Sequence, residues 1–186
     1  MATNYWQGRR IRLRAMIPSD VSLFDAFDDD ISRNVDAVYF PQSKQRFQNW
    51  FDAEIAKERN DDSFRWVAEN LEDEPIGTID TFDCNRRFGT FKYGLALVTQ
   101  HQAKGYAREI IFLVLRYYFH ELRYQKVTPH VYSFNQSSIK LHEKMGFKRE
   151  GQLRNMVYSG GEFFDEIYYG MTSDEFDKLF TDHLSR

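Results

Sequence analysis

The segment QAKGYAREI, residues 102–110, places a glycine and several hydrogen-bond donors where a strand-like run of residues passes into a helical one. The first backbone N–H groups of a helix have no partners within the helix, and the positive end of the helix dipole attracts anions there. Gly105 permits close approach of the backbone to a ligand because it has no Cβ. The segment also contains the small Ala107 and the side-chain donors Gln102, Lys104 and Arg108. The pattern favours a pyrophosphate site, and the competing interpretation is an ordinary strand–helix turn.

A second polar group lies at the start of the segment NQSSIKLHEKMG, residues 135–146. Asn135 and Ser138 have the types and spacing of a helix N-cap and its first-turn partner. His142 follows one turn later, and an imidazole with a pKa of about 6.5 is suited to proton transfer near neutral pH. Each of these residues therefore has a structural interpretation, as a cap or a helix-face residue, and a chemical one.

Length and composition predict one folded domain over residues 1–186. Hydrophobic residues make up 42% of the sequence and aromatic residues 17%, which is enough for a packed core. The net charge of −3 and the lack of a long basic run argue against an obligate nucleic-acid partner. Cys84 is the single cysteine, and His101, His120 and His130 show no ligand spacing, so no metal site is expected. No apolar run approaches the roughly 18 residues of a membrane span, so no membrane partner is expected, and the cytoplasm is the expected location.

Local patterns predict an α+β fold with a mostly antiparallel sheet flanked by helices. Strands are expected over 9–15, 64–70, 75–83, 90–98 and 126–133. Helices are expected from Ser19 or Asp20 to Phe27, and over 43–59, 105–122 and 135–146. The acidic run at 28–30 is expected to end the first helix, and Gly146 is expected to end the helix before it. The pair Gly160–Gly161 predicts a hairpin, and residues 173–184 predict a closing amphipathic helix.

Four segments in order resemble the GNAT superfamily of N-acetyltransferases. QAKGYA (102–107) matches the superfamily's Gln/Arg-x-x-Gly-x-Gly/Ala signature, and NQSSIKLHEKMGFKREG (135–151) is similar to its second landmark. SGGEFFDEIYYGM (159–171) resembles the closing hairpin of the RimJ/RimL-type branch, and RIRLRAMIPSD (10–20) resembles that branch's first strand and helix. The layout is also similar to that of the spermidine acetyltransferases, and the resemblance covers roughly 9–175.

The resemblance implies a single GNAT-like domain with a mixed sheet whose central strands splay apart. It implies that acetyl-CoA donates its acetyl group directly to a primary amine, and that the pantetheine arm lies between strands 90–98 and 126–133. A backbone N–H of Leu97 or Val98 would polarise the thioester carbonyl, as an oxyanion hole does.

The resemblance also implies roles for polar residues in both landmarks. Asn135 would contact the pantetheine amide, and Ser138 would face the sulfur. The remaining expected cofactor contacts lie in or near the two landmarks: Thr99, Gln102, Ala103, Lys104, Gly105, Tyr106, Ala107, Arg108 and Lys144.

Two positions depart from the family pattern. Many relatives have a tyrosine at the position of His142, as the acid that protonates the leaving thiolate, so either Ser138 or His142 is the expected acid. Relatives often have a glutamate as base where this chain has Lys92. Asp80, Asp83 or a chain of water molecules are the alternative bases.

The acceptor is expected to meet the acidic segment FDAFDDDISRNVD, residues 24–36, which would attract a cation. A polyamine fits this charge, a protein N-terminal amine is the RimJ/RimL-type alternative, and a solvated acidic loop is the structural one. A non-catalytic acetyl-CoA sensor of the same fold is the competing function, and a nucleotide-binding protein of another fold is a third. A homodimer would be in keeping with the resemblance.

Overall fold

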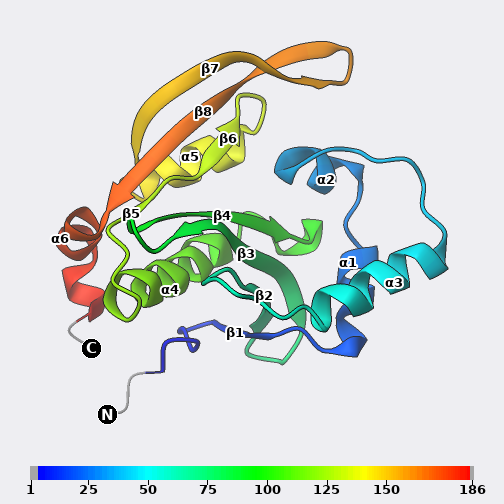
Figure 1. The fold of residues 1–186 in the computed structure, drawn as a ribbon, viewed down its shortest axis with the longest axis horizontal. Helices are drawn as coiled ribbons and strands as arrows, with labels where there is room; N and C mark the ends of the chain where they lie inside the picture. The colour runs from blue at the N-terminus through cyan, green and yellow to red at the C-terminus, as the bar shows by residue number, and fades with distance from the viewer. Residues whose placement is uncertain (1–3, 185–186) are drawn as a thin grey trace. The chain divides into compact units, whose positions relative to one another are not determined.

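The computed structural model describes residues 4–184 and forms two compact units (Figure 1). The first unit contains the residues up to 81 together with 94–114, and the second contains 82–93 together with the residues from 115 onward. Strands β3 (Pro75–Asn85) and β4 (Thr90–Leu97) pair as a hairpin whose tip belongs to the second unit. The fold is α+β, as the sequence predicts.

The sheet of the first unit is antiparallel. Strand β1 (Ile11–Ala15) pairs with β2 (Arg65–Asn70), and β2 pairs with β3. Ile11 and Leu13 are buried while the residue between them is exposed, which confirms the strand predicted from the alternation at 9–15.

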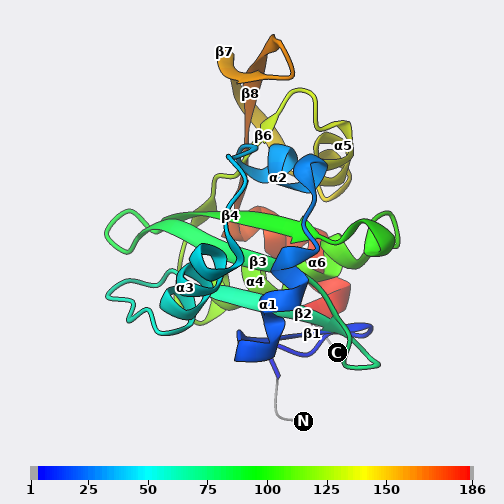
Figure 2. The same ribbon diagram turned by 90° about the vertical axis from the view of Figure 1, so that its right-hand side faces the viewer.

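Helices α1 (Val21–Asp25) and α3 (Lys44–Ile55) lie on one face of these strands, and the first half of α4 (Tyr106–His120) lies on the other (Figure 2). A short 3₁₀ turn, Pro18–Asp20, leads into α1. Helix α3 ends at Ile55, earlier than the predicted 59. Five buried side chains form the core under α1 and α3: Leu23, Phe24, Phe51, Val67 and Val98.

The acidic run at 28–30 was expected to end a helix, and this prediction was incomplete because the run also begins one. Helix α2 spans Asp29–Val35, and the Asp28 carboxylate caps it by accepting the Ile31 N–H at 2.8 Å. Asp29 and Asp30 lie in the first turn, where negative charge is stabilised by the helix dipole.

The second unit contains a mixed sheet. Strand β4 pairs in parallel with β5 (Lys126–Val127), and β8 (Glu162–Thr172) pairs antiparallel with β5, with β6 (His130–Tyr132) and with β7 (Lys148–Ser159). The predicted hairpin between β7 and β8 is confirmed, with positive φ angles at both turn glycines.

The predicted strand 126–133 is divided into β5 and β6 around Pro129, which has no N–H to donate. The parallel register of β4 with β5 consists of Thr90↔Lys126 and Phe91↔Val127, whereas β6 pairs with β8. Both short strands therefore pair with β8, and the parallel pairing with β4 is made by β5.

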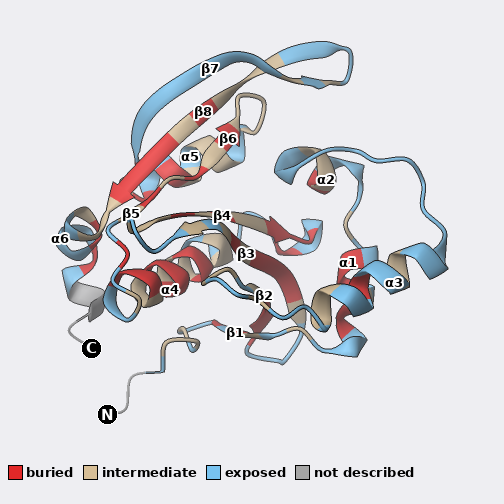
Figure 3. Ribbon diagram, in the orientation of Figure 1, coloured by how far each residue is buried: buried red, intermediate tan, exposed pale blue. Residues whose placement is uncertain are grey.

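Buried aromatic side chains and the last helices complete the second unit. Phe91 is fully buried and stacks on Tyr118 with ring centroids 4.2 Å apart. Helix α5 (Gln136–Lys144) ends before Gly146, whose φ of 88° confirms the predicted stop, and α6 spans Ser173–Leu184. Burial is deep along the second half of β8, whereas β7 is exposed along most of its length (Figure 3). In the described part of the chain, no helix has the length and apolar character needed to cross a membrane.

Phe91→Ala is expected to lower the free energy of unfolding by about 3–5 kcal/mol, because it removes a fully buried ring and leaves a cavity. Phe88→Ala, at a side chain that is 61% exposed, should change it by less than about 0.5 kcal/mol. Urea unfolding monitored by circular dichroism measures both. Equal effects of the two variants would contradict the assignment of Phe91 to the core.

Candidate active site

The end of strand β4 presents one backbone amide away from its strand partner. The Val98 N–H donates to the Ile76 carbonyl of β3 at 3.1 Å. Since N–H groups of successive residues in an extended strand point to opposite edges, the Leu97 N–H is directed away from β3. Of the two amides expected at the thioester carbonyl, that of Val98 is therefore already engaged, and that of Leu97 has the suitable direction.

The loop after β4 has the geometry of an anion site. The 3₁₀ turn Thr99–His101 is followed by two positive φ angles, 57° at Ala103 and 83° at Gly105, directly before helix α4. The backbone turns sharply there, and the first N–H groups of α4 have no acceptor within the helix. Lys104 is exposed beside them. These groups fit a pyrophosphate, whose negative charges they would neutralise.

Two side chains hold this loop in place. The Gln102 amide donates from Nε2 to the Leu97 carbonyl at 3.0 Å, which ties the loop to the edge of β4. Arg10 is the second of these side chains, and its Nη2 would lie 3.2 Å from a Cβ built at Gly105. The sequence suggested that the missing Cβ leaves room for a ligand, and the structure shows that this space faces an arginine.

Helix α5 organises the second polar group. The Asn135 carbonyl oxygen Oδ1 accepts the Ser138 N–H at 3.0 Å and the Ser137 hydroxyl at 2.9 Å, so the capping interpretation of Asn135 is confirmed. Ser138 is half-buried in the first turn. The cap fixes the direction of that turn and therefore the position of the Ser138 side chain.

His142 lies inside the unit, between two tyrosines. Its Nδ1 is 2.8 Å from the Ser138 carbonyl and 3.4 Å from the Ser138 hydroxyl, and its Nε2 is 2.8 Å from the Tyr93 hydroxyl. A carbonyl can only accept, so Nδ1 carries the proton and Nε2 accepts from Tyr93. The imidazole also stacks between the rings of Tyr93 and Tyr169.

Burial keeps both partners of this hydrogen bond neutral. His142 is 4% exposed, and burial lowers its pKa, although the bond to the Ser138 carbonyl opposes the shift. Burial also raises the pKa of Tyr93 well above that of an exposed tyrosine. Tyr93 was not predicted from the sequence. Its position directly before Gly94 in β4 was the available signal, but its contact with His142 depends on the tertiary fold.

The two aspartates considered as bases are both paired with cations. Asp83 accepts from Lys92 at 2.9 Å, and Asp80 accepts from Arg65 at 3.1 Å. Burial raises the pKa of Asp80, and the Arg65 guanidinium opposes that shift. Lys92, which stands where relatives often have a glutamate, thus has a structural partner of its own.

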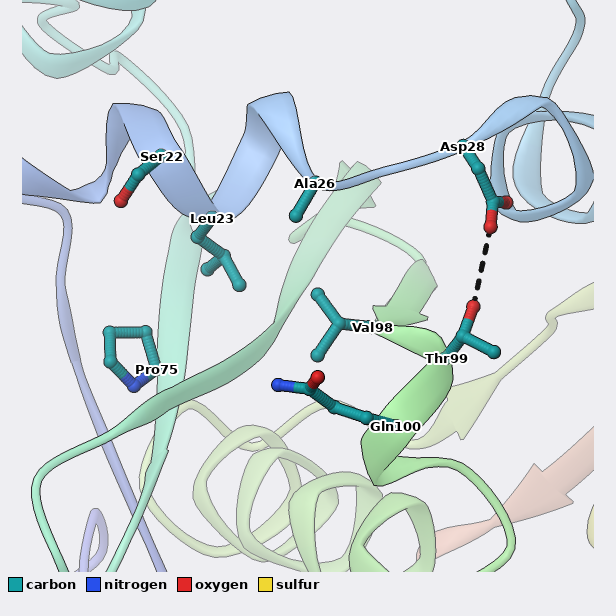
Figure 4. A pocket seen from close by; sticks show the side chains of 8 residues that line it. All are labelled: Ser22, Leu23, Ala26, Asp28, Pro75, Val98, Thr99 and Gln100. Atoms are coloured by element: carbon teal, nitrogen blue, oxygen red, sulfur yellow. Dashed lines mark hydrogen bonds between the residues drawn. The ribbon is translucent and has the colours of Figure 1, made fainter.

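A pocket of about 340 Å³ lies in the first unit, between helix α1 and the end of β4 (Figure 4). Leu23, Ala26 and Val98 point toward one another across it. Its polar rim includes the Asp28 carboxylate, which accepts the Thr99 hydroxyl at 3.3 Å. The other lining residues are Ser22, Pro75 and Gln100.

Other candidates from the sequence lie elsewhere. Phe51 is fully buried in the core, whereas Tyr39 and Phe40 are 66% and 93% exposed outside the pocket. His101 is buried, with Nε2 3.2 Å from a Glu74 carboxylate oxygen. Among the residues that the structure describes, no three or more His, Cys, Asp or Glu side chains come together as a metal-ion site.

Known proteins are similar to this chain in sequence and in fold. A family model of the acetyltransferase (GNAT) domain matches residues 10–148. The SPbeta prophage-derived uncharacterized N-acetyltransferase YokL of Bacillus subtilis is 46% identical over 177 residues, 95% of this chain and 98% of that protein. The spermidine N(1)-acetyltransferase of Vibrio cholerae is 24% identical over 156 residues, 84% of this chain and 89% of that protein.

A solved structure has the same fold. The spermidine N-acetyltransferase from Vibrio cholerae in complex with CoA and spermine has a TM-score of 0.79 at 22% identity, and the alignment covers 91% of this chain and 99% of that chain. The chain belongs to the GNAT family of acetyltransferases and is an N-acetyltransferase that takes its acetyl group from acetyl-CoA.

Proposed function

We propose that the acceptor is a small aliphatic polyamine and that it binds in the pocket between α1 and the end of β4. The observation that carries this proposal is the combination of the Asp28 carboxylate with an apolar wall of Leu23, Ala26 and Val98. A polyamine offers the matching groups, since methylene segments pack on the wall and a distal ammonium pairs with the carboxylate. The similarity to a spermidine N(1)-acetyltransferase supports this class of acceptor.

One residue of the pocket follows, in the chain, the residue whose amide we assign to the thioester carbonyl. Val98 lines the pocket, and Leu97, whose N–H we assign to the carbonyl, is the residue before it in the chain. An N–H fixed in a strand stabilises the oxyanion that develops when the amine attacks, because it needs no reorganisation. The residues of the loop, from Thr99 to Arg108, bind the pyrophosphate in this proposal, and Asn135 and Lys144 add cofactor contacts.

Ser138 and His142 have different roles at the sulfur in this proposal. The Ser138 hydroxyl donates a hydrogen bond to the departing thiolate, which lowers its basicity, and solvent, which takes up the proton of the amine, returns one proton to the thiolate. His142 has no proton to give, because its one N–H is held by the Ser138 carbonyl and its other nitrogen accepts from Tyr93. Passing a proton through the imidazole would leave a buried tyrosinate, which the raised pKa of Tyr93 opposes. His142 therefore acts as a positioning residue for the turn that carries Ser138.

Water removes the proton from the attacking amine in this proposal, since Asp80 and Asp83 are held in ion pairs. A RimJ/RimL-type enzyme acting on a protein N-terminus is the second candidate, favoured by the resemblance of the hairpin at 159–171. A single domain over 1–186, a cytoplasmic location and a homodimer stay predictions.

Asp28→Asn is expected to raise KM for spermidine about two- to fivefold, the size of an exposed ion pair. The change removes the charge but keeps the cap of α2, because asparagine caps a helix as well as aspartate. Asp29→Asn removes the same charge one residue later, outside the pocket, and is the matched control. Steady-state kinetics with spermidine and with a monoamine measures the effect. The pocket assignment fails if Asp28→Asn and Asp29→Asn raise KM for spermidine equally. It also fails if Asp28→Asn raises KM for the monoamine as much as KM for spermidine.

Ser138→Ala is expected to lower kcat about 10- to 100-fold, the range of a lost hydrogen bond to a charged group, while the Kd for CoA changes little. His142→Phe should lower kcat and also the melting temperature, because it leaves the Tyr93 hydroxyl buried without its acceptor. The pH profile of kcat should keep its shape in His142→Phe. Loss of a titrating limb in that variant would instead identify His142 as the acid.

Without a protein base, kcat/KM for spermidine should rise by about tenfold per pH unit between pH 6 and 9, because the amine, with a pKa of about 10.4, must lose its proton before it attacks. Initial rates in buffers of constant ionic strength give this profile. A plateau above pH 7 would show that a group of the protein takes the proton.

A further inference from the structure

Arg10, just before strand β1, contacts the loop that we assign to the pyrophosphate. Its Nη1 donates to the Lys104 carbonyl at 2.9 Å, and its guanidinium carbon lies 5.1 Å from the centre of the Tyr106 ring. Its Nη2 faces the position that a Cβ of Gly105 would occupy. Arg10 thus contacts Lys104 and Tyr106, the residues on either side of Gly105, where the loop becomes helix α4.

Glu109, in the first turn of α4, holds Arg10 in this position. One carboxylate oxygen accepts the backbone N–H groups of Arg9 and Arg10, and the other lies 3.4 Å from the Arg10 Nε. The Glu109 side chain is 16% exposed and that of Arg10 is 50% exposed. The carboxylate therefore ties backbone and side chain of the N-terminal segment to the helix that follows the loop.

The contact with Lys104 determines which way the loop amide points. The carbonyl of Lys104 and the N–H of Gly105 belong to one planar trans peptide, so they point in opposite directions. Holding the carbonyl toward Arg10 therefore directs the Gly105 N–H to the opposite side. An anion site needs this arrangement, with N–H groups facing the ligand and carbonyls turned away.

We propose that Arg10 is a positioning residue that preorganises the loop for the acetyl-CoA pyrophosphate, an inference that rests on the proposed role of this loop. Arginine suits this task because one planar group donates to a carbonyl and stacks on an aromatic ring at once. Gly105 is required on this account for its positive φ and because a side chain there would meet the guanidinium.

The test compares Arg10→Gln, Arg10→Lys and the control Arg9→Gln. Arg9 is a neighbouring exposed cation whose described contact with Glu109 is made by its backbone N–H. Its variant therefore removes the same charge and keeps the hydrogen bonds of the Glu109 carboxylate. Calorimetric titration with CoA should show Kd raised about tenfold or more in both Arg10 variants, as for a lost hydrogen bond to a charged group. Arg9→Gln should stay within about twofold of the wild type.

A second donor separates positioning of the loop from a general loss of structure. S-acetyl-pantetheine is an acetyl thioester without phosphates, so its transfer rate should be the same in wild type and Arg10 variants. With acetyl-CoA, KM should rise and kcat should stay within about twofold. Lysine retains the charge, so wild-type CoA affinity in Arg10→Lys would overturn the proposal in favour of simple charge attraction.

Failure of this inference is distinct from failure of the loop assignment. Wild-type protein that binds CoA tightly, with Arg10→Gln binding it equally well, overturns the role of Arg10 alone. Equal weakening in Arg9→Gln and Arg10→Gln also overturns it. If the wild-type protein binds S-acetyl-pantetheine as tightly as it binds acetyl-CoA, the phosphates add no affinity. That result would overturn the pyrophosphate assignment itself.

Discussion

The alternation of backbone amides at the end of β4 is the constraint on which the site depends. Because the Val98 N–H donates to β3, the N–H and the carbonyl of Leu97 face the other edge of the strand, where the Gln102 amide donates to that carbonyl. The pocket that we assign to the acceptor also borders Val98. The strand geometry at this position therefore sets the direction of the amide that we assign to the thioester carbonyl, the start of the loop before α4 and one wall of the pocket.

Polar contacts over long sequence separations keep these local groups in their active conformation. Gly105 adopts its positive φ without steric cost, whereas the positive φ of Ala103 is strained and persists only when surrounding contacts enforce it. Arg10 contacts the loop between these two residues, at the Lys104 carbonyl, across 94 residues of sequence. In the second unit, Tyr93 and His142 are neutral partners in a buried hydrogen bond. His142 in turn donates to the Ser138 carbonyl and so fixes the first turn of α5.

The sequence predicted the parts of the molecule that local patterns encode. The strand at 9–15, the stop at Gly146, the cap at Asn135 and the glycine hairpin each follow from short-range geometry. Helix α2 was missed because three aspartates in a row look like a helix end, although aspartates equally suit a helix start. The partners Tyr93–His142 and Arg10–Lys104 could not be predicted, since they meet through folding.

Thiol release from acetyl-CoA, measured against spermidine, spermine, simple monoamines and short peptides with varied N-termini, tests the central claim most directly. The account predicts rapid release with the polyamines, because they combine an attacking amine with methylene segments for the apolar wall and a second ammonium for the Asp28 carboxylate. Release with the peptides and none with the polyamines would contradict the assignment of the pocket and favour an N-terminal acceptor. Tight acetyl-CoA binding with no release on any amine would contradict catalysis on these acceptors.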